Sequence, residues 1–264
     1  MTNRTLIRGL LGLLFVGLLA APLVIKRWSD GASSASIDRE AALERYGFVL
    51  DEVATESGIR FQHEAPDLDT SLHHVMPEVA SVGASVSVAD VDEDGHSDLY
   101  VTNSAYGTEN ALYRNRGDGS FENVAPTLGL AQVNQPGTGT SMGSVWGDYN
   151  NDGYEDLFLY KWGRCQLYRN EGGTGFTTVT DRLQGLPDWM NANTAVWMDV
   201  NRDGHLDLFV GGFYQEKFNL WDLETTRVMP ESYEYATNGG RNYLFLNQGD
   251  GTVREGSEEM GLTS

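Results

Sequence analysis

Residues 144–160 read SVWGDYNNDGYEDLFLY, which is an apolar stretch, a turn rich in Asp and Asn, and a second apolar stretch. Leu157 and Leu159 in the second stretch recur at a period of two, which is typical of β-strands. The Asn, Asp and Gly residues between the stretches are turn formers. The segment therefore predicts an antiparallel hairpin that is closed by an acidic loop.

The same pattern occurs in two other places, as SVSVADVDEDGHSDLYV at 85–101 and AVWMDVNRDGHLDLFVG at 195–211. Each copy is followed by a second block with a Gly-rich turn, at 110–130, 165–186 and 242–262. One unit thus contains four strands, which is the composition of one β-propeller blade. We expect an all-β fold, a β-propeller of four-stranded antiparallel blades, preceded by an N-terminal hydrophobic helix.

Three full units are fewer than the roughly 4–8 blades that close a propeller ring. Residues 47–59 (GFVLDEVATESGI) match only the last strand of a unit and predict an orphan N-terminal outer strand. We therefore expect an incomplete propeller, either a fragment of a longer protein, which we favour, or one closed by another chain. The third unit also carries an aromatic-rich insert at 212–241, which predicts an ordered excursion. A plain loop and a binding role both remain open for it.

The charge balance limits the classes of partner. The chain has 18 Lys and Arg against 38 Asp and Glu, and its formal net charge is −20. A phosphate backbone needs a basic face, so no nucleic-acid partner is expected. The single cysteine, Cys165, excludes an intramolecular disulfide framework and a Cys-rich zinc site.

The N-terminus predicts export. Residues 9–25 are uncharged and mostly apolar, with basic residues on both sides, so residues 1–28 are expected to be a signal anchor or a signal peptide. Ser33 and Ala35 could occupy a cleavage site. Residues 29–45 predict a linker and a short helix, and 46–264 the propeller portion. The protein is expected to be membrane-anchored, facing the periplasm or extracellular space, or secreted if the signal is cleaved.

The acidic loops share the pattern D-x-[D/N]-x-D-G-x-x-D-L. Side-chain oxygens at positions 1, 3, 5 and 9 and the backbone carbonyl of position 7 can converge on one ion, and hard oxygens in this number suit Ca²⁺. About three structural Ca²⁺ sites are therefore predicted. Their candidate ligands are Asp90, Asp92, Asp94, His96 and Asp98; Asp148, Asn150, Asp152, Tyr154 and Asp156; and Asp199, Asn201, Asp203, His205 and Asp207.

Two alternatives compete with the calcium interpretation of these loops. An EF-hand needs Glu at position 12 and helices on both sides, whereas position 12 is Val101, Leu159 or Val210 and the flanks alternate like strands. Turns that bind no ion are the second alternative. Three copies with identical spacing argue against it, because the uncompensated carboxylates would repel one another.

Two further features have plain structural interpretations, and a third, a group of histidines, has a functional one. The tripeptide Arg116-Gly117-Asp118 lies in a hairpin pattern that recurs at 247–251 and predicts a turn rather than an adhesion site. Trp146 and Trp197 occupy the position of Val88 and are expected to be packing residues of the blades rather than a sugar platform. His63, His73 and His74 could contribute to a metal or catalytic site, although no cysteine accompanies them.

The Asp-loop units resemble the FG-GAP/VCBS repeat of integrin α-subunit propellers. ESGIRFQHE (56–64), DYNNDGYEDLFLY (148–160) and residues 219–252 are similar to bacterial relatives of the cartilage acidic protein family. This resemblance implies a seven-bladed-type propeller with a further C-terminal domain, calcium binding and extracellular interaction. It implies no known catalytic activity.

The expected function is that of an exported calcium-binding propeller that acts as a scaffold for a protein or glycan ligand on a propeller face. The alternative is an extracytoplasmic polysaccharide hydrolase or lyase, with its active site on the propeller face or in a missing C-terminal part. The sequence contains no G-x-S-x-G elbow, P-loop or dinucleotide fingerprint, and no catalytic residue is nominated.

Overall fold

The computed structural model describes residues 39–74, 83–224 and 239–262. The chain divides into two compact units, Met1–Glu52 and Val53–Ser264. In the first unit, helix α2 (Arg39–Tyr46) has no buried residue, and Arg39 forms an ion pair with Asp51. No helix in the described ranges is long and apolar enough to cross a membrane. The anchor predicted within residues 1–28 lies outside these ranges.

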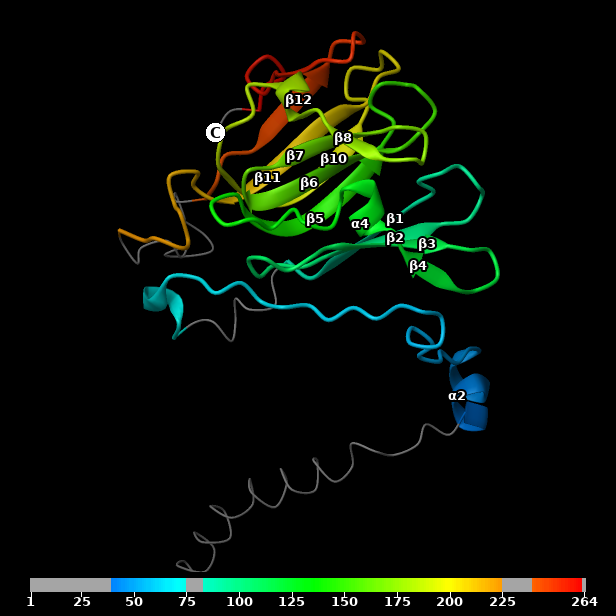
Figure 1. Ribbon diagram of the computed structural model, residues 1–264. Helices are drawn as coiled ribbons and strands as arrows, with labels where there is room; N and C mark the ends of the chain where they lie inside the picture. The colour runs from blue at the N-terminus through cyan, green and yellow to red at the C-terminus, as the bar shows by residue number, and fades with distance from the viewer. Residues whose placement is uncertain (1–38, 75–82, 225–238, 263–264) are drawn as a thin grey trace, which may run out of the picture. The chain divides into compact units, whose positions relative to one another are not determined.

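The second unit begins with a four-stranded antiparallel sheet (Figure 1). Its strands follow one another in chain order, and each pairs with the next: β1 (Ser85–Ala89), β2 (Asp98–Thr102), β3 (Ala111–Asn115) and β4 (Phe121–Asn123). The short helix α4 (Ala125–Leu128) follows β4, and Gly129 ends it in the left-handed conformation. This is the first predicted blade.

The second and third blades each have the same strand order. They consist of β5 (Gly139–Gly147), β6 (Asp156–Gly163), β7 (Gln166–Asn170) and β8 (Phe176–Thr178), then β10 (Met190–Met198), β11 (Asp207–Tyr214), β12 (Tyr243–Asn247) and β13 (Val253–Glu255). Met190 and Asn191 of β10 pair with Gly163 and Trp162 of β6, which joins the two blades into a nine-stranded sheet. The 3₁₀ turn η2 (Thr180–Arg182) and strand β9 (Leu183–Gln184) lie between them, and β9 runs parallel to β13.

The second blade is buried on both faces because successive side chains of a strand point to opposite sides. Leu157 and Leu159 of β6 pack in a core with Tyr100 and Leu112 of the first blade. Phe158, between them in sequence, packs in another core with residues of the third blade such as Phe245. This face-to-face packing explains why β6 is a continuous apolar run. The fold is that of propeller blades, as predicted.

Trp146 and Trp197 take part in this packing, as expected. The Trp146 ring meets Tyr100 edge-on, with the ring centroids 6.0 Å apart, and its Nε1 donates to Ser87 Oγ of the first blade at 2.8 Å. Trp197 stacks on Tyr149 with a centroid separation of 6.1 Å. Both rings therefore contribute to contacts between neighbouring blades.

The segment 47–59, predicted to be an outer strand, contains no strand. Residues 53–59 form instead the turn that follows an outer strand, with Ser57 N donating to Val53 O at 2.9 Å and Ile59 N to Ala54 O at 2.8 Å. The same two bonds recur one unit later at residues 124–130 and again at 256–262. An outer strand forms by pairing with the third strand of its own blade. The sequence of residues 1–46 contains no copy of the blade pattern that would supply such a third strand.

The turn at 53–59 is held by the first blade. Phe121 N of β4 donates to Ser57 O at 2.8 Å, and a Cβ on Gly58 would lie 2.7 Å from the Phe121 carbonyl oxygen. Gly185 also lies close to β13, where a Cβ would meet Glu255 Cβ at 2.8 Å, whereas at Gly129 the nearest atom, Phe176 O of β8, is 4.0 Å away. The close approach of a glycine to the next outer strand is therefore found at Gly58 and Gly185 but not at Gly129.

The insert of the third blade is ordered over residues 215–224, and residues 225–238 lie outside the described ranges. Phe218 and Leu220 pack in a third core with Leu68 and Leu72, from the segment that contains the 3₁₀ turn η1 (Thr70–Leu72), and with Trp162 and Tyr214. Asp69 N donates to Leu220 O at 2.9 Å, and Asp69 Oδ2 accepts from Leu223 N at 3.1 Å. Residues 215–224 of the insert therefore pack on the blades.

Candidate metal centres in the three Asp-rich loops

Each Asp-rich loop connects the first and second strands of a blade, and in all three loops the side chain at position 1 accepts the same two backbone N–H groups. In the second loop, Asp148 Oδ1 accepts from Asp152 N at 3.0 Å, and Asp148 Oδ2 accepts from Gly153 N at 2.9 Å. Asp90 and Asp199 accept the equivalent pairs at 2.8–3.1 Å. These bonds therefore hold each loop in a coil around its position 1 carboxylate.

Two residues in each loop have positive φ. Position 6 is glycine, as predicted, with φ of 86°, 94° and 88°. Position 4 is also left-handed, although it is Glu93, Asn151 and Arg202, with φ of 57°, 58° and 63°. Only glycine, and to a lesser degree Asn and Asp, adopts this conformation readily. Of the three residues at position 4, Glu93 and Arg202 are therefore in a backbone region that is unfavourable for their residue type, whereas Asn151 tolerates it.

Position 9 anchors each loop to the third strand of its own blade. Asp98 Oδ1, Asp156 Oδ1 and Asp207 Oδ1 accept from Asn115 N, Asn170 N and Asn247 N at 2.7–2.8 Å. All three carboxylates are buried. Burial raises the pKa of Asp98, and it raises the pKa of Asp156 to about 7. A buried carboxylate disfavours its charged form unless a cation or further donors compensate it.

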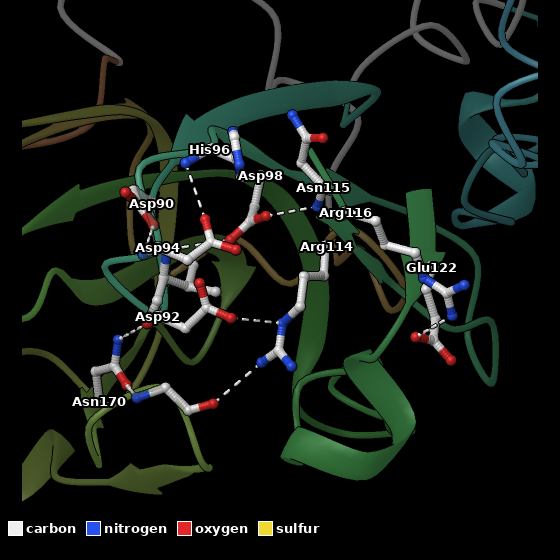
Figure 2. Close-up of polar contacts among 12 residues, drawn as sticks. Asp90, Asp92, Asp94, His96, Asp98, Arg114, Asn115, Arg116, Glu122 and Asn170 are labelled. Atoms are coloured by element: carbon white, nitrogen blue, oxygen red, sulfur yellow. Dashed lines mark hydrogen bonds and ion pairs between the residues drawn. The ribbon is translucent and has the colours of Figure 1, made fainter. Parts of the chain in front are cut away.

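The first loop brings its carboxylates together most closely. Oxygens of Asp90, Asp92 and Asp98 lie within 4.8 Å of one another, and Figure 2 shows these side chains gathered with Asp94. Arg114 Nε contacts Asp92 Oδ2 at 3.0 Å, so this loop, which has an extra Asp at position 3, also has its own counter-charge. The first site is therefore electrostatically different from the other two.

The remaining predicted ligands are placed as follows. Asp94, Asp152 and Asp203 at position 5 each accept from the backbone N–H of position 7, at 2.9–3.0 Å. Asn150 and Asn201 at position 3 each accept from the N–H of position 5, at 2.8 and 3.0 Å. These oxygens lie in the coil of the loop, but among the described residues no position 5 carboxylate joins a cluster of three converging ligand atoms.

Position 7 was predicted to contribute its carbonyl, and its side chain has a separate packing role. The rings of His96 and His205 lie against Gly117 and Gly249, where a Cβ would come within 2.4 and 2.8 Å of the imidazole Nε2 atoms. Tyr154 lies similarly over Gly172. The Gly-rich turn of each second hairpin thus makes room for the side chain that follows the loop glycine.

The other residues singled out from the sequence do not form a metal centre. Arg116 pairs with Glu122 at 2.6 Å and Asp118 accepts from Ser120 N at 2.9 Å, which is the geometry of a hairpin turn. His63 Nε2 lies 3.0 Å from Ser104 Oγ, and His73 lies 3.6 Å from Asp67. Across the described ranges, three or more Asp, Glu, His or Cys ligand atoms converge only at Asp90, Asp92 and Asp98.

Sequence reasoning missed the contacts between neighbouring loops. Asn170 Nδ2 donates to Val91 O in the first loop at 2.8 Å, and Asn247 Nδ2 donates to Tyr149 O in the second at 2.7 Å. Glu155 Oε2 also lies 3.4 Å from Asp90 N. The recurrence of Asn at 115, 170 and 247 was the available signal, but the alignment assigned it only to a turn.

Comparison with known proteins agrees with this geometry. A family model described as an FG-GAP-like repeat matches residues 90–159 and 148–210. Residues 90–210 are therefore similar to FG-GAP-like repeats. Cartilage acidic protein 1 from Homo sapiens is 27% identical over 195 residues, which cover 68% of this chain and 28% of that protein. Integrin alpha-6 from Homo sapiens is 26% identical over 166 residues, which cover 54% of this chain and 14% of that protein.

The matched region spans less than a third of these relatives' length. A solved structure of an Agrocybe aegerita lectin, described as specifically recognising non-reducing terminal N-acetylglucosamine, aligns with a TM-score of 0.35 and 22% identity. The alignment covers 64% of this chain and 36% of the lectin chain.

The donor set of the FG-GAP-like loops fits Ca²⁺. Asp92 Oδ1 and Asp156 Oδ2 are buried, and within the described part of the chain neither accepts a hydrogen bond. An unpaired buried carboxylate oxygen is costly and a bound cation would satisfy it. The predicted ligands are all oxygens, which is the chemistry of a Ca²⁺ site rather than a zinc or copper site.

Proposed function

We propose that the chain is an exported, calcium-binding β-propeller that acts as an extracytoplasmic interaction scaffold. The observation that carries the calcium proposal is the threefold repetition of one loop geometry, with a coiled position 1 carboxylate and a buried position 9 carboxylate tied to the third strand. A bound ion would supply positive charge that compensates these carboxylates. Its role is structural, because the ligands themselves link the strands of a blade.

The size of the effect follows from mass action. Extracellular calcium modules have Kd values of about 0.1–1 mM, and ~1 mM Ca²⁺ then adds roughly 0.4–1.4 kcal/mol per site. Three sites would contribute about 1–4 kcal/mol, against a typical stability of about 5–15 kcal/mol. The full chain is melted in Ca²⁺, in Mg²⁺ and in chelator. The proposal expects Ca²⁺ alone to raise the Tm by several degrees, and equal Tm values in all three would contradict it.

A protein or glycan ligand is proposed to bind at the end of the blades away from the acidic loops. There Tyr106, between β2 and β3, stacks on Trp221 of the insert with a centroid separation of 5.0 Å, and Trp189 meets Trp221 edge-on at 6.1 Å. All three rings are half-buried. Half-exposed aromatic rings that come from three segments supply the apolar area and polar edges typical of recognition sites.

This partner site is tested with a glycan array and the variant Trp221→Ala. Phe213→Ala is the matched control, because Phe213 is an exposed aromatic on β11 outside this cluster. Binding that Trp221→Ala removes and Phe213→Ala keeps would support the site. Binding that both variants keep would place the ligand elsewhere. Export and membrane attachment are proposed from residues 1–28 alone, and fractionation of expressing cells tests them.

A further inference from the structure

Two buried asparagines each contact two neighbouring acidic loops. Asn170, the last residue of β7, donates from Nδ2 to Val91 O of the first loop at 2.8 Å and to Glu155 O of its own loop at 3.1 Å. Asn247, the last residue of β12, donates from Nδ2 to Tyr149 O of the second loop at 2.7 Å and to Leu206 O of its own loop at 3.1 Å. One carboxamide therefore fixes position 2 of the preceding loop and position 8 of its own.

These bonds belong to a continuous path between the position 9 carboxylates of the first two loops. Asp98 Oδ2 accepts from Val91 N at 3.1 Å, Val91 O accepts from Asn170 Nδ2, and Asn170 N donates to Asp156 Oδ1 at 2.8 Å. All four residues are at most 2% exposed. Figure 2 shows Asn170 beside the acidic side chains of the first loop, although it comes from the second blade.

Part of this path repeats between the second and third loops, without its first link, because Asp156 Oδ2 accepts no hydrogen bond among the described residues. Tyr149, at position 2 of the second loop, accepts from Asn247 Nδ2, and Asn247 N donates to Asp207 Oδ1 at 2.8 Å. Asp207 Oδ2 in turn accepts from Val200 N, at position 2 of the third loop, at 3.0 Å. Each of the two junctions between acidic loops thus has the same asparagine in the same place.

We propose that Asn170 and Asn247 couple neighbouring loops, so that a cation bound in one loop raises the affinity of the next loop. The proposal rests on calcium binding by the loops. Position 2 lies between two ligands, at positions 1 and 3, so an ion that orders them also orders the position 2 peptide. The asparagine passes this order to the strand end that holds the next position 9 carboxylate. Buried hydrogen bonds of this kind are strong and directional, and coupling between sites is reciprocal.

The chain contains a matched control for this role. Asn115 ends β3 and contacts its own loop as the other two do, with its N–H on Asp98 Oδ1 at 2.7 Å and its Nδ2 on Ser97 O at 3.2 Å. Among the contacts of the described residues, it makes no hydrogen bond to a second acidic loop. Asn115→Ala removes the contact within a loop, whereas Asn170→Ala removes in addition the contact between loops.

The test is calorimetric titration of the full chain with Ca²⁺. In every protein the third loop is silenced, that is, made unable to bind Ca²⁺, by Asp199→Asn with Asp203→Asn. The Ca²⁺ affinity of the first loop is then measured with the second loop either intact or silenced by Asp148→Asn with Asp152→Asn. With Asn170 present, and in Asn115→Ala, we expect silencing of the second loop to weaken the first by about 5-fold or more. In Asn170→Ala, silencing of the second loop should change the Ca²⁺ affinity of the first loop by less than about 2-fold.

If silencing of the second loop weakens Ca²⁺ binding by the first loop by the same factor in Asn170→Ala and in Asn115→Ala, the coupling is overturned and calcium binding stands. Absence of saturable binding in every protein, with strand-type circular dichroism retained, would overturn the calcium proposal and the coupling with it. If Asn170→Ala does not fold, Asn247→Ala tests the equivalent bond between the second and third loops, with the first loop silenced instead. In that case too, unchanged coupling between the two remaining loops contradicts the proposal.

Discussion

Arg202 occupies position 4 of the third loop with φ of 63°, and Asn151 occupies the same position in the second loop. Asn tolerates the left-handed region, whereas Arg has no side-chain group that offsets the clash of its Cβ with the carbonyl. Arg202→Asn should therefore stabilise the chain by about 0.5–1 kcal/mol, which is about 1–4 °C in Tm for a domain of this size. The reverse change in the second loop, Asn151→Arg, is the control and should lower the Tm. A Tm that neither variant changes would contradict the account.

Asp156 gives the protein a pH dependence without calcium. Its pKa in the folded chain is about 7, raised by burial from 3.8. Between these values the folded state binds more protons than the unfolded state, so stability without calcium falls as the pH rises from about 4 to 7. The loss is at most about 4 kcal/mol, at 1.36 kcal/mol per pH unit.

In chelator, Asp156→Asn should remove this slope and raise the Tm at pH 7.5, because the amide carries no charge to bury. In saturating Ca²⁺ the same variant should be less stable than the parent, because it lacks one anionic ligand. Denaturant titrations at several pH values check both signs. A variant that is less stable than the parent in both media would contradict a cation-dependent role for this carboxylate.

Strand β6 is the element on which both blade interfaces depend. Leu157 faces the first blade and Phe158 faces the third, and both are fully buried. Leu157→Ala should cost about 2–5 kcal/mol and Phe158→Ala about 3–5 kcal/mol in free energy of unfolding. Val86→Ala, at an exposed position of β1, should stay within about 0.5 kcal/mol. A tolerated change at either buried position would contradict burial of the second blade on both faces.

The turn at 53–59 can be tested through its glycine. Gly58 has φ of 89° and its Cβ position is 2.7 Å from the Phe121 carbonyl, whereas Gly119 has φ of 86° with open space around it. Gly119→Ala therefore measures the backbone penalty alone, about 1 kcal/mol. Gly58→Ala should cost more and should expose the turn to proteolysis. Equal costs for the two variants would contradict docking of this turn on β4.

The strand pattern and the loop geometry were predictable because each depends on residues close in sequence. Alternation predicted β2, β6 and β11, and the spacing of Asp148, Asp152 and Gly153 predicted a coiled acidic loop. The strain at Arg202 was not predictable, since the residue type gives no sign of positive φ. The segment 47–59 was predicted wrongly as a strand, because similarity to an outer strand does not supply the neighbour with which a strand must pair.

At the scale of the whole molecule, the contacts between blades could not be read from the sequence. Asn170 and Val91 are 79 residues apart, and only the packed blades bring them within 2.8 Å. The repeat predicted that the blades exist, but neither their join through β10 and β6 nor the third core around Trp162 has a local signal. Long-range pairing is decided by how the units pack, which local propensity does not encode.

The central claim is that the three acidic loops bind calcium as structural ligands, and counting bound ions tests it most directly. Calorimetric titration of the full chain with Ca²⁺ at neutral pH should show saturable binding of close to three ions. A variant with Asp148→Asn and Asp152→Asn should bind one fewer. A folded chain, shown by its strand-type circular dichroism, that takes up no Ca²⁺ at millimolar concentration would contradict the account.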